Sequence, residues 1–439
     1  MTKARMKSDA FTAEIDAIEE LSEKYWIKNV IYYKWDTIEY KDLINKLKKF
    51  WILLYNYSNK EDLKEQILEF HKKYEIIFVS TPMELLVNAV NEIKQILDRP
   101  ISDHPDIFRD KYLQRELIAN YNNDLWVKFL KWEPEDLEIK EIEEKIWYPF
   151  IIKPVDWVQS SWVAKVTSEC EFKEYIRTYI DFHDRLKNRW IDNKLLIVEE
   201  FIDGKLYSLD YYVDHEWNTV ISKPVKVFLW IDVWVEDYAN IARKTTDKTE
   251  EEFKWKRLKT FVNSTVKATW IRNVFVHHEF KINSKWEFKT IELNGRIGWG
   301  RLDLMKRTYG LNLYEMLVNP DIKAWKLKEN NIYVNIYATK RWILKDFNKK
   351  LFEKIEKRET VYDIDFDESF IWKEVWLTKD WFIKIWAIKL ASKDHKEILK
   401  DFKYIKNKYK DLLEIEAIKW KKKKTMLCRV KWFFKKKKK

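Results

Sequence analysis

Glycine is scarce in this chain, and its scarcity limits the folds available, because tight turns and helix ends need residues with a positive backbone φ angle. The 439 residues include five glycines and 24 tryptophans, whereas glycine alone usually supplies about 7% of a protein. Trp217, Trp286 and Trp381 fall between strand-like runs, where hairpin turns are expected. Trp270 follows a helical periodicity, where a left-handed glycine commonly ends a helix. We predict positive φ angles at these positions.

A genetic code in which UGA specifies glycine, translated here with a table that makes it tryptophan, explains both counts. The alternative is a tryptophan-rich protein that binds carbohydrate or nucleic acid by stacking, which would require aromatic residues on exposed platforms. These tryptophans instead follow Asp, Lys, Glu or Ile in turn-like contexts. We therefore interpret most of them as glycines.

The charge of the chain does not indicate a nucleic-acid-binding body. The formal net charge is +12, from 84 basic and 72 acidic residues. Lys421–Lys424 and Lys435–Lys439 supply nine lysines, and taking these nine from +12 leaves +3 for the rest. We interpret residues 421–439 as a disordered basic tail, with contact to anionic lipid or RNA as the alternative.

The sequence shows neither a membrane span nor a signal peptide. Its longest apolar runs fall far short of the ~20 residues that cross a bilayer. The basic start is soon followed by acidic residues rather than by an apolar core. We expect a cytoplasmic protein.

The chain is long enough for several domains, which usually contain ~100–200 residues. Short apolar runs at Val30–Tyr33, Ile52–Tyr55 and Ile76–Val79 alternate with helix-like stretches at Leu63–Tyr74 and Met83–Leu97. This βα repeat predicts a small parallel sheet. A helix near residues 111–120 and strand-rich α+β sequence follow, and the last part predicts short strands with a late helix.

The first candidate site is a strand that delivers a lysine into a flexible loop. Phe150–Lys153 has the pattern of a strand, and residues 156–162 form the loop once Trp157 and Trp162 are taken as glycines. Backbone N–H groups in such a loop can hold phosphate oxygens, while Lys153 supplies a positive charge. The alternative is an ordinary Gly/Ser turn between two strands.

The second candidate site is the apolar strand Leu195–Val198, which ends in Glu199 and Glu200. Neighbouring carboxylates at a strand end can accept hydrogen bonds from the amino group of adenine or from ribose hydroxyls. The alternative is a solvated strand end.

The third candidate site is a pair of acidic residues on a predicted hairpin. With the turn centred between Lys285 and Trp286, Glu279 lies opposite Glu292, and the two-residue period places Asn294 on the same face. Opposed carboxylates repel each other unless one is protonated or a cation lies between them. Oxygen ligands of this kind suit Mg²⁺. The alternative is the polar outer face of an exposed hairpin.

In chain order, these motifs resemble those of the ATP-grasp family. They are Lys111, Lys153-Pro154, the glycine-like loop, Glu199-Glu200-Phe201-Ile202, Glu279 and Glu292-Leu293-Asn294-Gly295-Arg296. The resemblance covers roughly Asp103 to Pro320 and implies a mixed α/β and α+β fold. It implies a Rossmann-like domain at 1–105, an ATP-grasp domain of two α+β subdomains at 106–331 with a lid at 147–205, a small C-terminal α+β domain at 332–420 and the basic tail at 421–439.

The resemblance also implies a role for each motif. The ATP phosphates would be bound by Lys111, Lys153, Asp156, Ser160 and Ser161, and the adenine would be held by Glu199, Glu200, Phe201 and Ile202. The ligands of Mg²⁺, or of Mn²⁺ in its place, would be Glu279, Glu292 and Asn294. Arg296 would lie near an acyl phosphate and, with Lys153, would act in catalysis.

These roles imply a ligase that uses ATP and Mg²⁺ to activate a small carboxylate as an acyl phosphate and then couples it to an amine or similar nucleophile. We expect small carboxylic acid and amine substrates, no nucleic-acid partner, and a homodimer as the candidate assembly. The alternative is a non-catalytic or degenerate ATP-grasp protein, or a lysine-rich nucleic-acid-binding protein.

We expect the gene to carry UGA at most of the 24 tryptophan codons, because glycine there would restore both the usual glycine content and the turns. Sequencing the gene, together with mass spectrometry of the protein from its native source, tests this expectation. UGG at all of these codons would refute the recoding hypothesis.

Overall fold

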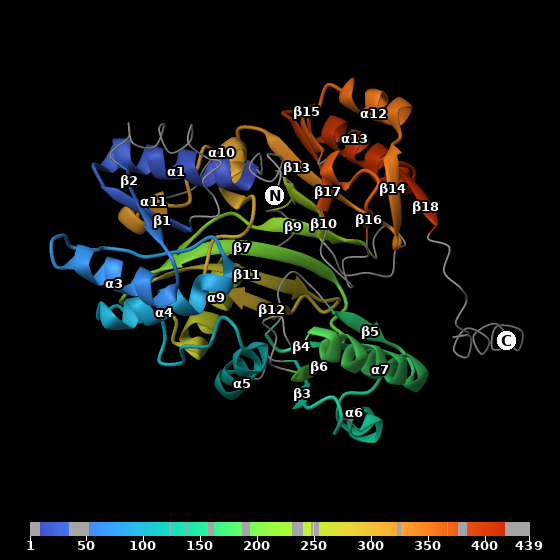
Figure 1. Ribbon diagram of the computed structural model, residues 1–439, viewed down its shortest axis with the longest axis horizontal. Helices are drawn as coiled ribbons and strands as arrows, with labels where there is room; N and C mark the ends of the chain where they lie inside the picture. Colours follow the sequence, from blue (N-terminus) through green and yellow to red (C-terminus); the bar gives the residue numbers. More distant parts are fainter. Residues whose placement is uncertain are drawn as a thin grey trace, which may run out of the picture.

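The structure is a computed structural model that describes residues 9–34, 52–122, 125, 127–136, 138–156, 162–186, 194–230, 240–246, 249, 254–322, 326–366, 368–375 and 384–417. A nine-stranded sheet crosses its centre, and a four-stranded sheet lies below it in the view of Figure 1. Smaller sheets of two and three strands lie in the N-terminal and C-terminal parts. Helices and strands are mixed along the chain, which confirms the predicted fold class.

The strands of the nine-stranded sheet are antiparallel to their neighbours. In spatial order they are β12 (Phe288–Asn294), β11 (Val274–Ile282), β7 (Lys205–Val213), β9 (Val225–Leu229), β10 (Asn240–Thr245), β13 (Asn330–Tyr337), β17 (Lys384–Ser392) and β15 (Val361–Phe366), with β8 (Thr219–Ile221) paired to β7. The boundary predicted between residues 331 and 332 falls within β13, so the sheet continues into the C-terminal part without a break.

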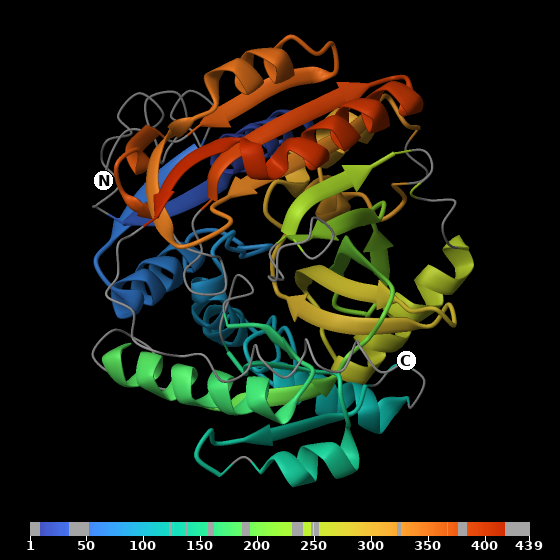
Figure 2. The same cartoon turned by 90° about the vertical axis from the view of Figure 1, so that its right-hand side faces the viewer.

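The four-stranded sheet is also antiparallel, with the spatial order β3 (Phe129–Trp132), β6 (Leu196–Glu200), β4 (Phe150–Pro154) and β5 (Ala164–Val166). Helices α6 (Ile139–Lys145) and α7 (Glu169–Leu186) cover one face, where Phe150, Ile152 and Val198 are buried. Because side chains alternate along a strand, Lys153 and Glu199 lie on the other face. Figure 2 shows this layer at the bottom of the molecule, opposite the C-terminal part at the top.

The N-terminal part contains α1 (Asp9–Tyr25), β1 (Asn29–Lys34), β2 (Ile52–Tyr57), α3 (Lys60–His71), the short 3-10 helix η4 (Glu84–Leu86) and α4 (Val87–Ile96). Strands β1 and β2 pair in parallel, as predicted. The prediction of a third strand at Ile76–Val79 is wrong, because the described backbone there forms no strand. The ring of Phe78 packs edge-on against Tyr212 and Phe275 instead, so this segment joins the N-terminal part to the central sheet.

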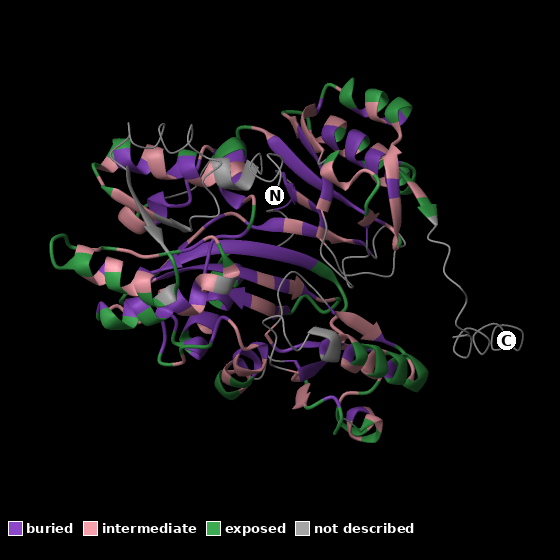
Figure 3. Ribbon diagram, in the orientation of Figure 1, coloured by how far each residue is buried: buried purple, intermediate pink, exposed green. Residues whose placement is uncertain are grey.

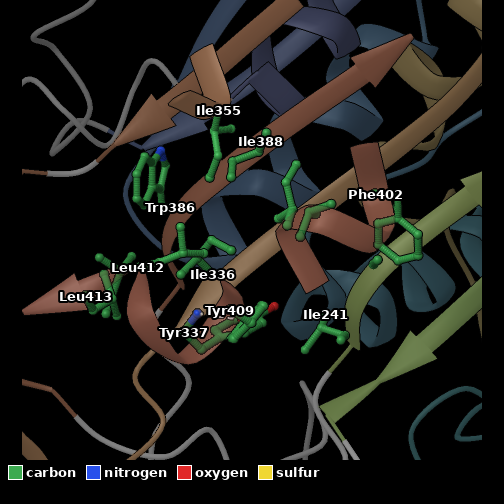
Figure 4. Close-up of a cluster of buried hydrophobic side chains, with 14 of the residues drawn as sticks. Ile241, Ile336, Tyr337, Ile355, Trp386, Ile388, Phe402, Tyr409, Leu412 and Leu413 are labelled. Carbon is green, nitrogen blue, oxygen red and sulfur yellow. Dashed lines mark hydrogen bonds between the residues drawn. The ribbon is translucent and has the colours of Figure 1, made fainter. Parts of the chain in front are cut away.

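The C-terminal part adds a three-stranded sheet of β16 (Glu374–Val375), β14 (Trp342–Phe347) and β18 (Leu413–Ala417), with helices α12 (Lys349–Glu356), η6 (Glu368–Phe370), α13 (His395–Lys408) and η7 (Tyr409–Asp411). Figure 4 shows part of its buried core, a cluster that includes Ile336, Trp386 and Phe402. The same cluster includes Ile241 of β10. The core therefore joins the C-terminal part to the central sheet.

The two faces of the central sheet are covered by different helices. Helix α9 (Trp255–Thr269) packs on the face that carries Tyr211 and Val276. Helix α10 (Arg301–Tyr309), with α11 (Glu315–Val318) after it, packs near Tyr212 and Phe275 on the other face. Figure 3 shows that strands β7 and β11, which lie between these helices, are mostly buried. Because the face of Tyr212 also presents Asp210 two residues earlier, a polar group enters the interior there.

Helix ends in the structure have local chemical causes. The side chain of Asp110 accepts a hydrogen bond from Leu113 N–H at 3.0 Å and caps α5 (Lys111–Tyr121). Helix α9 ends at Trp270, which has the left-handed φ of 52° predicted for it. In the described part of the chain, no helix combines the length and apolarity needed to cross a membrane.

The hairpin of β11 and β12 brings Glu279 opposite Glu292, as predicted, but by a different route. Close to the turn the pairing is one residue away from the predicted register, since Ile282 pairs with Phe288. The turn is a three-residue loop, residues 284–286. It is closed by a hydrogen bond from Asn283 N–H to the Glu287 carbonyl at 3.1 Å. A bulge between Glu279 and Phe280 then shifts the register and restores the predicted pair.

Tryptophan occupies most of the left-handed backbone positions that are not glycine. Among the described residues there are nine such positions, and seven of them are tryptophan, including Trp217 and Trp286 at the predicted turns. The other two, Asp98 and Asn273, are of types that tolerate this conformation. Trp381 lies outside the described residues. The turns that contain Trp217 and Trp286 are three-residue loops, and tryptophan is the third residue of each. In such loops the third residue follows a type I turn in the left-handed conformation and is usually glycine. The tryptophans thus adopt the backbone conformation of glycine.

We expect Trp286→Gly to raise the free energy of unfolding by about 1 kcal/mol, because a left-handed residue with a side chain is strained by ~1–2 kcal/mol. The indole of Trp286 is 57% exposed, so its removal loses little packing. Urea denaturation measures the effect.

Trp230→Gly provides the contrast. Trp230 is fully buried, and its indole N–H donates to Tyr409 Oη at 3.0 Å. We expect its loss to reduce stability by ~3–5 kcal/mol. Equal destabilisation by both substitutions would contradict the glycine-like reading of Trp286.

Candidate functional site

One face of α5 carries polar side chains into the interior. Lys111, Gln114 and Arg115 are buried, and their spacing of three and four residues places them on one side of the helix. Gln114 Nε2 donates to the Leu293 carbonyl at 2.9 Å, and its Oε1 accepts from Leu293 N–H at 3.0 Å. Arg115 donates to the Ile291 carbonyl at 2.6 Å. These bonds fix α5 against β12, the strand that carries two of the predicted metal ligands.

A buried triad of charged residues, joined by two ion pairs, connects α5 to the four-stranded sheet. Glu199 Oε1 lies 2.6 Å from Arg115 Nε, and Glu199 Oε2 lies 2.7 Å from Lys153 Nζ. Burial alone would raise the pKa of Glu199, but the charges of Arg115 and Lys153 outweigh it and hold that pKa below its ordinary value. Burial lowers the pKa of the Lys153 ammonium against the attraction of Glu199. Both carboxylate oxygens are engaged, so Glu199 orients Lys153.

Glu279, Glu292 and Asn294 lie on one face of β11 and β12. Glu279 and Glu292 are direct Cα partners, and Asn294 is the partner of His277. Glu292 Oε1 lies 3.2 Å from Lys111 Nζ, and Glu279 Oε1 lies 3.7 Å from His277 Nε2. A basic group therefore stands beside each of the two opposed carboxylates, which reduces the repulsion between them.

The oxygen atoms of these residues fit a small divalent cation. Asn294 is 4% exposed, and its Oδ1 has no hydrogen-bond partner. A buried, unsatisfied amide oxygen beside two carboxylates suits Mg²⁺ or Mn²⁺. Within the described ranges, no group of three or more His, Cys, Asp or Glu side chains is placed to hold a metal ion. Two carboxylates and one amide would leave coordination positions for other ligands, as Mg²⁺ sites commonly do.

Asp210 of β7 holds the loop that follows β12. Its Oδ1 accepts a hydrogen bond from Gly298 N–H at 2.7 Å and lies 3.0 Å from His277 Nδ1, while its Oδ2 lies 3.5 Å from Arg301 Nε. Burial alone would raise the pKa of Asp210, but His277 and Arg301 outweigh it and lower that pKa. A Cβ at position 298 would lie 2.4 Å from the His277 ring, so only glycine allows the loop to approach this closely.

Arg296 lies in the same loop and is 6% exposed. Its Nη2 lies 2.8 Å from Glu84 Oε2 of η4, and its Nη1 donates to the Ile297 carbonyl at 3.0 Å. Its Nε is buried without a hydrogen-bond partner. The guanidinium is therefore held in place by the N-terminal part of the chain, and its Nε–H is among the donors that stay unused.

The predicted adenine segment leaves the end of β6. Phe201 N–H donates to the Pro149 carbonyl at 3.3 Å, and the Ile202 carbonyl accepts from Lys281 Nζ at 2.8 Å. The Phe201 ring lies under Lys165 Nζ, 3.7 Å from the ring centre. Glu200, the last residue of β6, is only partly buried. Unlike Glu199, it is not part of the buried triad, and it stays a candidate contact to a ligand.

The predicted phosphate loop is described in part. Asp156 is described, and its carbonyl accepts a hydrogen bond from Arg109 at 2.7 Å. Its Oδ1 is buried without a hydrogen-bond partner. Ser160 and Ser161 lie outside the described residues. The start of the loop is thus tied to the segment that precedes α5.

Sequence reasoning missed Arg115, Asp210 and His277, which orient the predicted residues. Arg115 shares the spacing of Lys111 and Gln114 on α5, and this polar stripe was a usable signal. Asp210 interrupts the aromatic strand Tyr207–Tyr212, which is a second signal. The partners of these residues could not be identified, because they come from distant segments of the chain.

Comparisons with known proteins bear on the family and on the fold. Residues 146–301 match the family model described as the ATP-grasp domain. No curated protein has a significantly similar sequence.

Several solved structures are similar to nearly the whole chain. An L-amino acid ligase from Bacillus licheniformis matches with a TM-score of 0.66 and 15% identity, over 91% of this chain and 95% of its own. The biotin carboxylase domain of 2-oxoglutarate carboxylase from Hydrogenobacter thermophilus, solved with MgADP, ADP and bicarbonate, matches with a TM-score of 0.58 and 13% identity, over 93% and 89%. N5-carboxyaminoimidazole ribonucleotide synthetase from Thermotoga maritima matches with a TM-score of 0.57 and 12% identity, over 92% and 97%. At these identities the likeness concerns the fold.

We expect Glu199→Gln to lower the free energy of unfolding by ~3–5 kcal/mol at pH 7, because it leaves Arg115 and Lys153 buried without their counter-charge. The native pKa of Glu199 is lowered, so its stabilisation is present above the unfolded pKa of ~4.3 and is lost as the pH falls through the native pKa. The difference between wild type and variant should therefore shrink below about pH 4. Urea denaturation across this pH range measures it.

Glu200→Gln is the matched control, since the neighbouring carboxylate is only partly buried. Its effect should stay within ~0.5 kcal/mol. If the two variants were equally stable, the triad would not hold the sheet to α5.

Proposed function

Because the chain carries an ATP-grasp domain and has the fold of ATP-grasp ligases, we propose that it is an ATP- and Mg²⁺-dependent ligase that activates a small carboxylate as an acyl phosphate and couples it to an amine. One observation carries this proposal. Two lysines from different layers each pair with a carboxylate: Lys111 of α5 with Glu292, and Lys153 of β4 with Glu199. The unsatisfied oxygen of Asn294 lies on the same strand as Glu292. Paired cations next to open oxygen ligands suit a nucleotide with its metal ion.

In this proposal the nucleotide lies between the two sheets. Lys111 and Lys153 bind its phosphates, with Asp156, Ser160 and Ser161 at the loop that folds over them. Glu200, Phe201 and Ile202 hold the adenine, partly through their backbone. Glu199 acts indirectly, because its carboxylate holds Lys153 in position. In the structure Glu292 pairs with Lys111. When the nucleotide and the cation bind, Lys111 would exchange this contact for the phosphates, and Glu292 would exchange it for the cation.

Glu279, Glu292 and Asn294 would hold Mg²⁺, or Mn²⁺ in its place, which when bound neutralises phosphate charge. A carboxylate oxygen of the first substrate attacks the γ-phosphorus and ADP leaves; the amine then attacks the acyl carbon and phosphate leaves. Arg296 supplies a fixed positive charge at the acyl phosphate. Its ion pair with Glu84 keeps the guanidinium from moving, which lowers the reorganisation needed during the reaction.

The proposal extends to the organisation of the protein. Residues 106–331 form the ATP-grasp domain, with the lid at 147–205, between the N-terminal domain at 1–105 and the C-terminal domain at 332–420. The substrates are a small carboxylic acid and an amine, supplied in the cytoplasm. A homodimer is the proposed assembly, and the biotin carboxylase domain from Hydrogenobacter thermophilus was solved as a dimer.

We expect Glu292→Ala to lower ADP release by ~100-fold or more, because it removes both a metal ligand and the partner of Lys111. The assay measures ADP release in the presence of Mg²⁺ for amino acids and other small acids tested in pairs with amines. ADP release in the wild type should require a carboxylate and should stop on chelation of Mg²⁺.

Glu287→Ala is the matched control, because Glu287 is an exposed carboxylate on the same hairpin. It should retain wild-type activity. Full ADP release by Glu292→Ala would overturn the proposal. RNA binding that persists in Glu292→Ala, weakens with salt and vanishes on deletion of residues 421–439 would support a lysine-rich nucleic-acid-binding protein instead.

A further inference from the structure

Lys94 of α4 is buried where the N-terminal part meets the central sheet. Its side chain is 3% exposed, and its helix neighbours Ile93 and Leu97 belong to an apolar cluster. Its Nζ lies 4.2 Å from the centre of the Phe78 ring and donates to the Asn273 carbonyl at 2.6 Å. The amino group is thus held between α4, the segment of Phe78 and the residue that precedes β11.

Lys94 has no acidic partner. Among the residues that the structure describes, no carboxylate lies within ion-pair distance of its Nζ. Burial lowers the pKa of Lys94 to about 7, and the positive charge of Arg99 adds to this effect. The Phe78 ring attracts an ammonium group, but this attraction does not offset the burial. The carbonyl of Asn273 accepts a hydrogen bond from a neutral amine as well, so that contact does not require the charge.

A cavity of about 10 Å³ lies beside this amino group. Its lining joins the two basic residues Lys94 and Arg99 to mostly apolar side chains, among them Ile76, Ile77 and Leu97. Ile77 is 44% exposed, so the cavity borders the surface. The volume is near the lower limit for a single water molecule. An occupant must therefore be very small, and the apolar walls favour a molecule without charge.

This cavity is separate from the proposed nucleotide site. Asn273 directly precedes β11, whereas Glu279 of the proposed metal site lies six residues further along that strand. At the usual rise of a β-strand, the two residues are about 20 Å apart. The proposed ligase reaction therefore gives Lys94 no role, and an inference about Lys94 does not rest on that reaction.

We propose that Lys94 is a modification site at which carbon dioxide adds to the side-chain amine and forms a carbamate. The nitrogen lone pair attacks the carbon of CO₂, an N–C bond forms, and one C=O bonding pair moves onto oxygen. The nitrogen then loses a proton to solvent. The step needs no further reactant, and its product is a carboxylate attached to Nζ.

The surroundings of Lys94 suit both the reactants and the product. Carbon dioxide is small and neutral, and it reacts with an amine that burial has left without its proton. The product is an anion, and Arg99 lines the same cavity. Carbamate formation thus replaces the repulsion between two cations by an attraction between opposite charges. The present partner of Arg99 is Glu75, at 3.5 Å and 76% exposed, and such a surface pair is weak.

Chemical trapping of the carbamate tests this inference on the unaltered chain. The full protein is equilibrated with isotopically labelled CO₂ at about pH 7.5 and treated with triethyloxonium, which converts carbamates into stable ethyl esters. Mass spectrometry of peptides then locates the label. At this pH an amine with a pKa of about 7 is mostly neutral, whereas an ordinary lysine is neutral in about one molecule in a thousand. We expect the label on Lys94 to exceed that on the exposed Lys72 by ~100-fold or more.

Cyanate provides the matched probe for the role of Arg99. It has the shape of CO₂ and also adds to neutral amines, but its product on lysine is uncharged. In Arg99→Gln we expect the ratio of CO₂ label to cyanate label on Lys94 to fall by ~5–10-fold, because only the carbamate needs a counter-charge. Arg99→Lys keeps the positive charge and should keep most of the ratio. Lys94→Arg should carry neither label at this position, and circular dichroism melting checks that each variant is folded.

The outcomes bear on the carbamate alone. Equal CO₂ labelling of Lys94 and Lys72 would overturn it. Labelling of Lys94 by cyanate but not by CO₂ would also overturn it, since the amine would then be reactive without forming a carbamate. An unchanged ratio of the two labels in Arg99→Gln would overturn the role of Arg99 as the counter-charge. None of these results affects the proposed ligase function, which ADP release tests separately.

Discussion

The buried carboxylate of Glu199 is the interaction on which the arrangement of the site depends. It bridges Arg115 of α5 and Lys153 of β4, and Arg115 in turn donates to the carbonyl of Ile291 on β12. The four-stranded sheet, α5 and the edge of the central sheet are thereby connected through charged groups at short distances. Because a buried charge is strongly unfavourable when its partner moves away, the three elements can shift only together. Lys153 therefore keeps a defined position relative to the carboxylates of β11 and β12.

The bulge in the β11–β12 hairpin also fixes the position of the carboxylates relative to α5. The extra residue lies at Ile291, next to Glu292, and the carbonyl of Ile291 is the acceptor for Arg115. In a regular ladder this carbonyl would be used by the neighbouring strand or point to solvent. The bulge frees it for α5 and at the same time turns Glu292 and Asn294 onto the face of Glu279. One irregularity in the backbone thus couples the ion-pair triad to the proposed metal ligands.

The sequence predicted those parts of the fold and site that depend on local periodicity. The strands of Lys153 and Glu199, the helix of Lys111 and the pairing of Glu279 with Glu292 follow from alternation and turn position, and the structure contains them. The pairing was correct although the turn was misplaced, because the bulge cancelled a one-residue error that no pattern reveals. Ile76–Val79 has the apolar character of a strand, but its packing against distant aromatic rings decided otherwise. The engagement of Glu199 also depends on residues far away in sequence, so a carboxylate at a strand end could not be recognised as a buried anchor.

The same distinction between local and distant causes bears on the tryptophans. Backbone conformation at a turn is local, and the chain folds as though glycine stood at Trp217, Trp286 and Trp270, since all three have left-handed φ angles. The side chains share no buried environment: five of the seven left-handed tryptophans among the described residues are exposed, Trp286 at 57% for example, whereas Trp162 is 8% exposed and packs against Tyr179. If indoles were selected for their packing, burial would be common to them and backbone conformation would vary. The reverse holds at these positions, so the fold requires the left-handed backbone there and does not require the indole. Trp230 differs from them, because its φ is not positive, its side chain is buried in the core and its indole N–H donates a hydrogen bond to Tyr409.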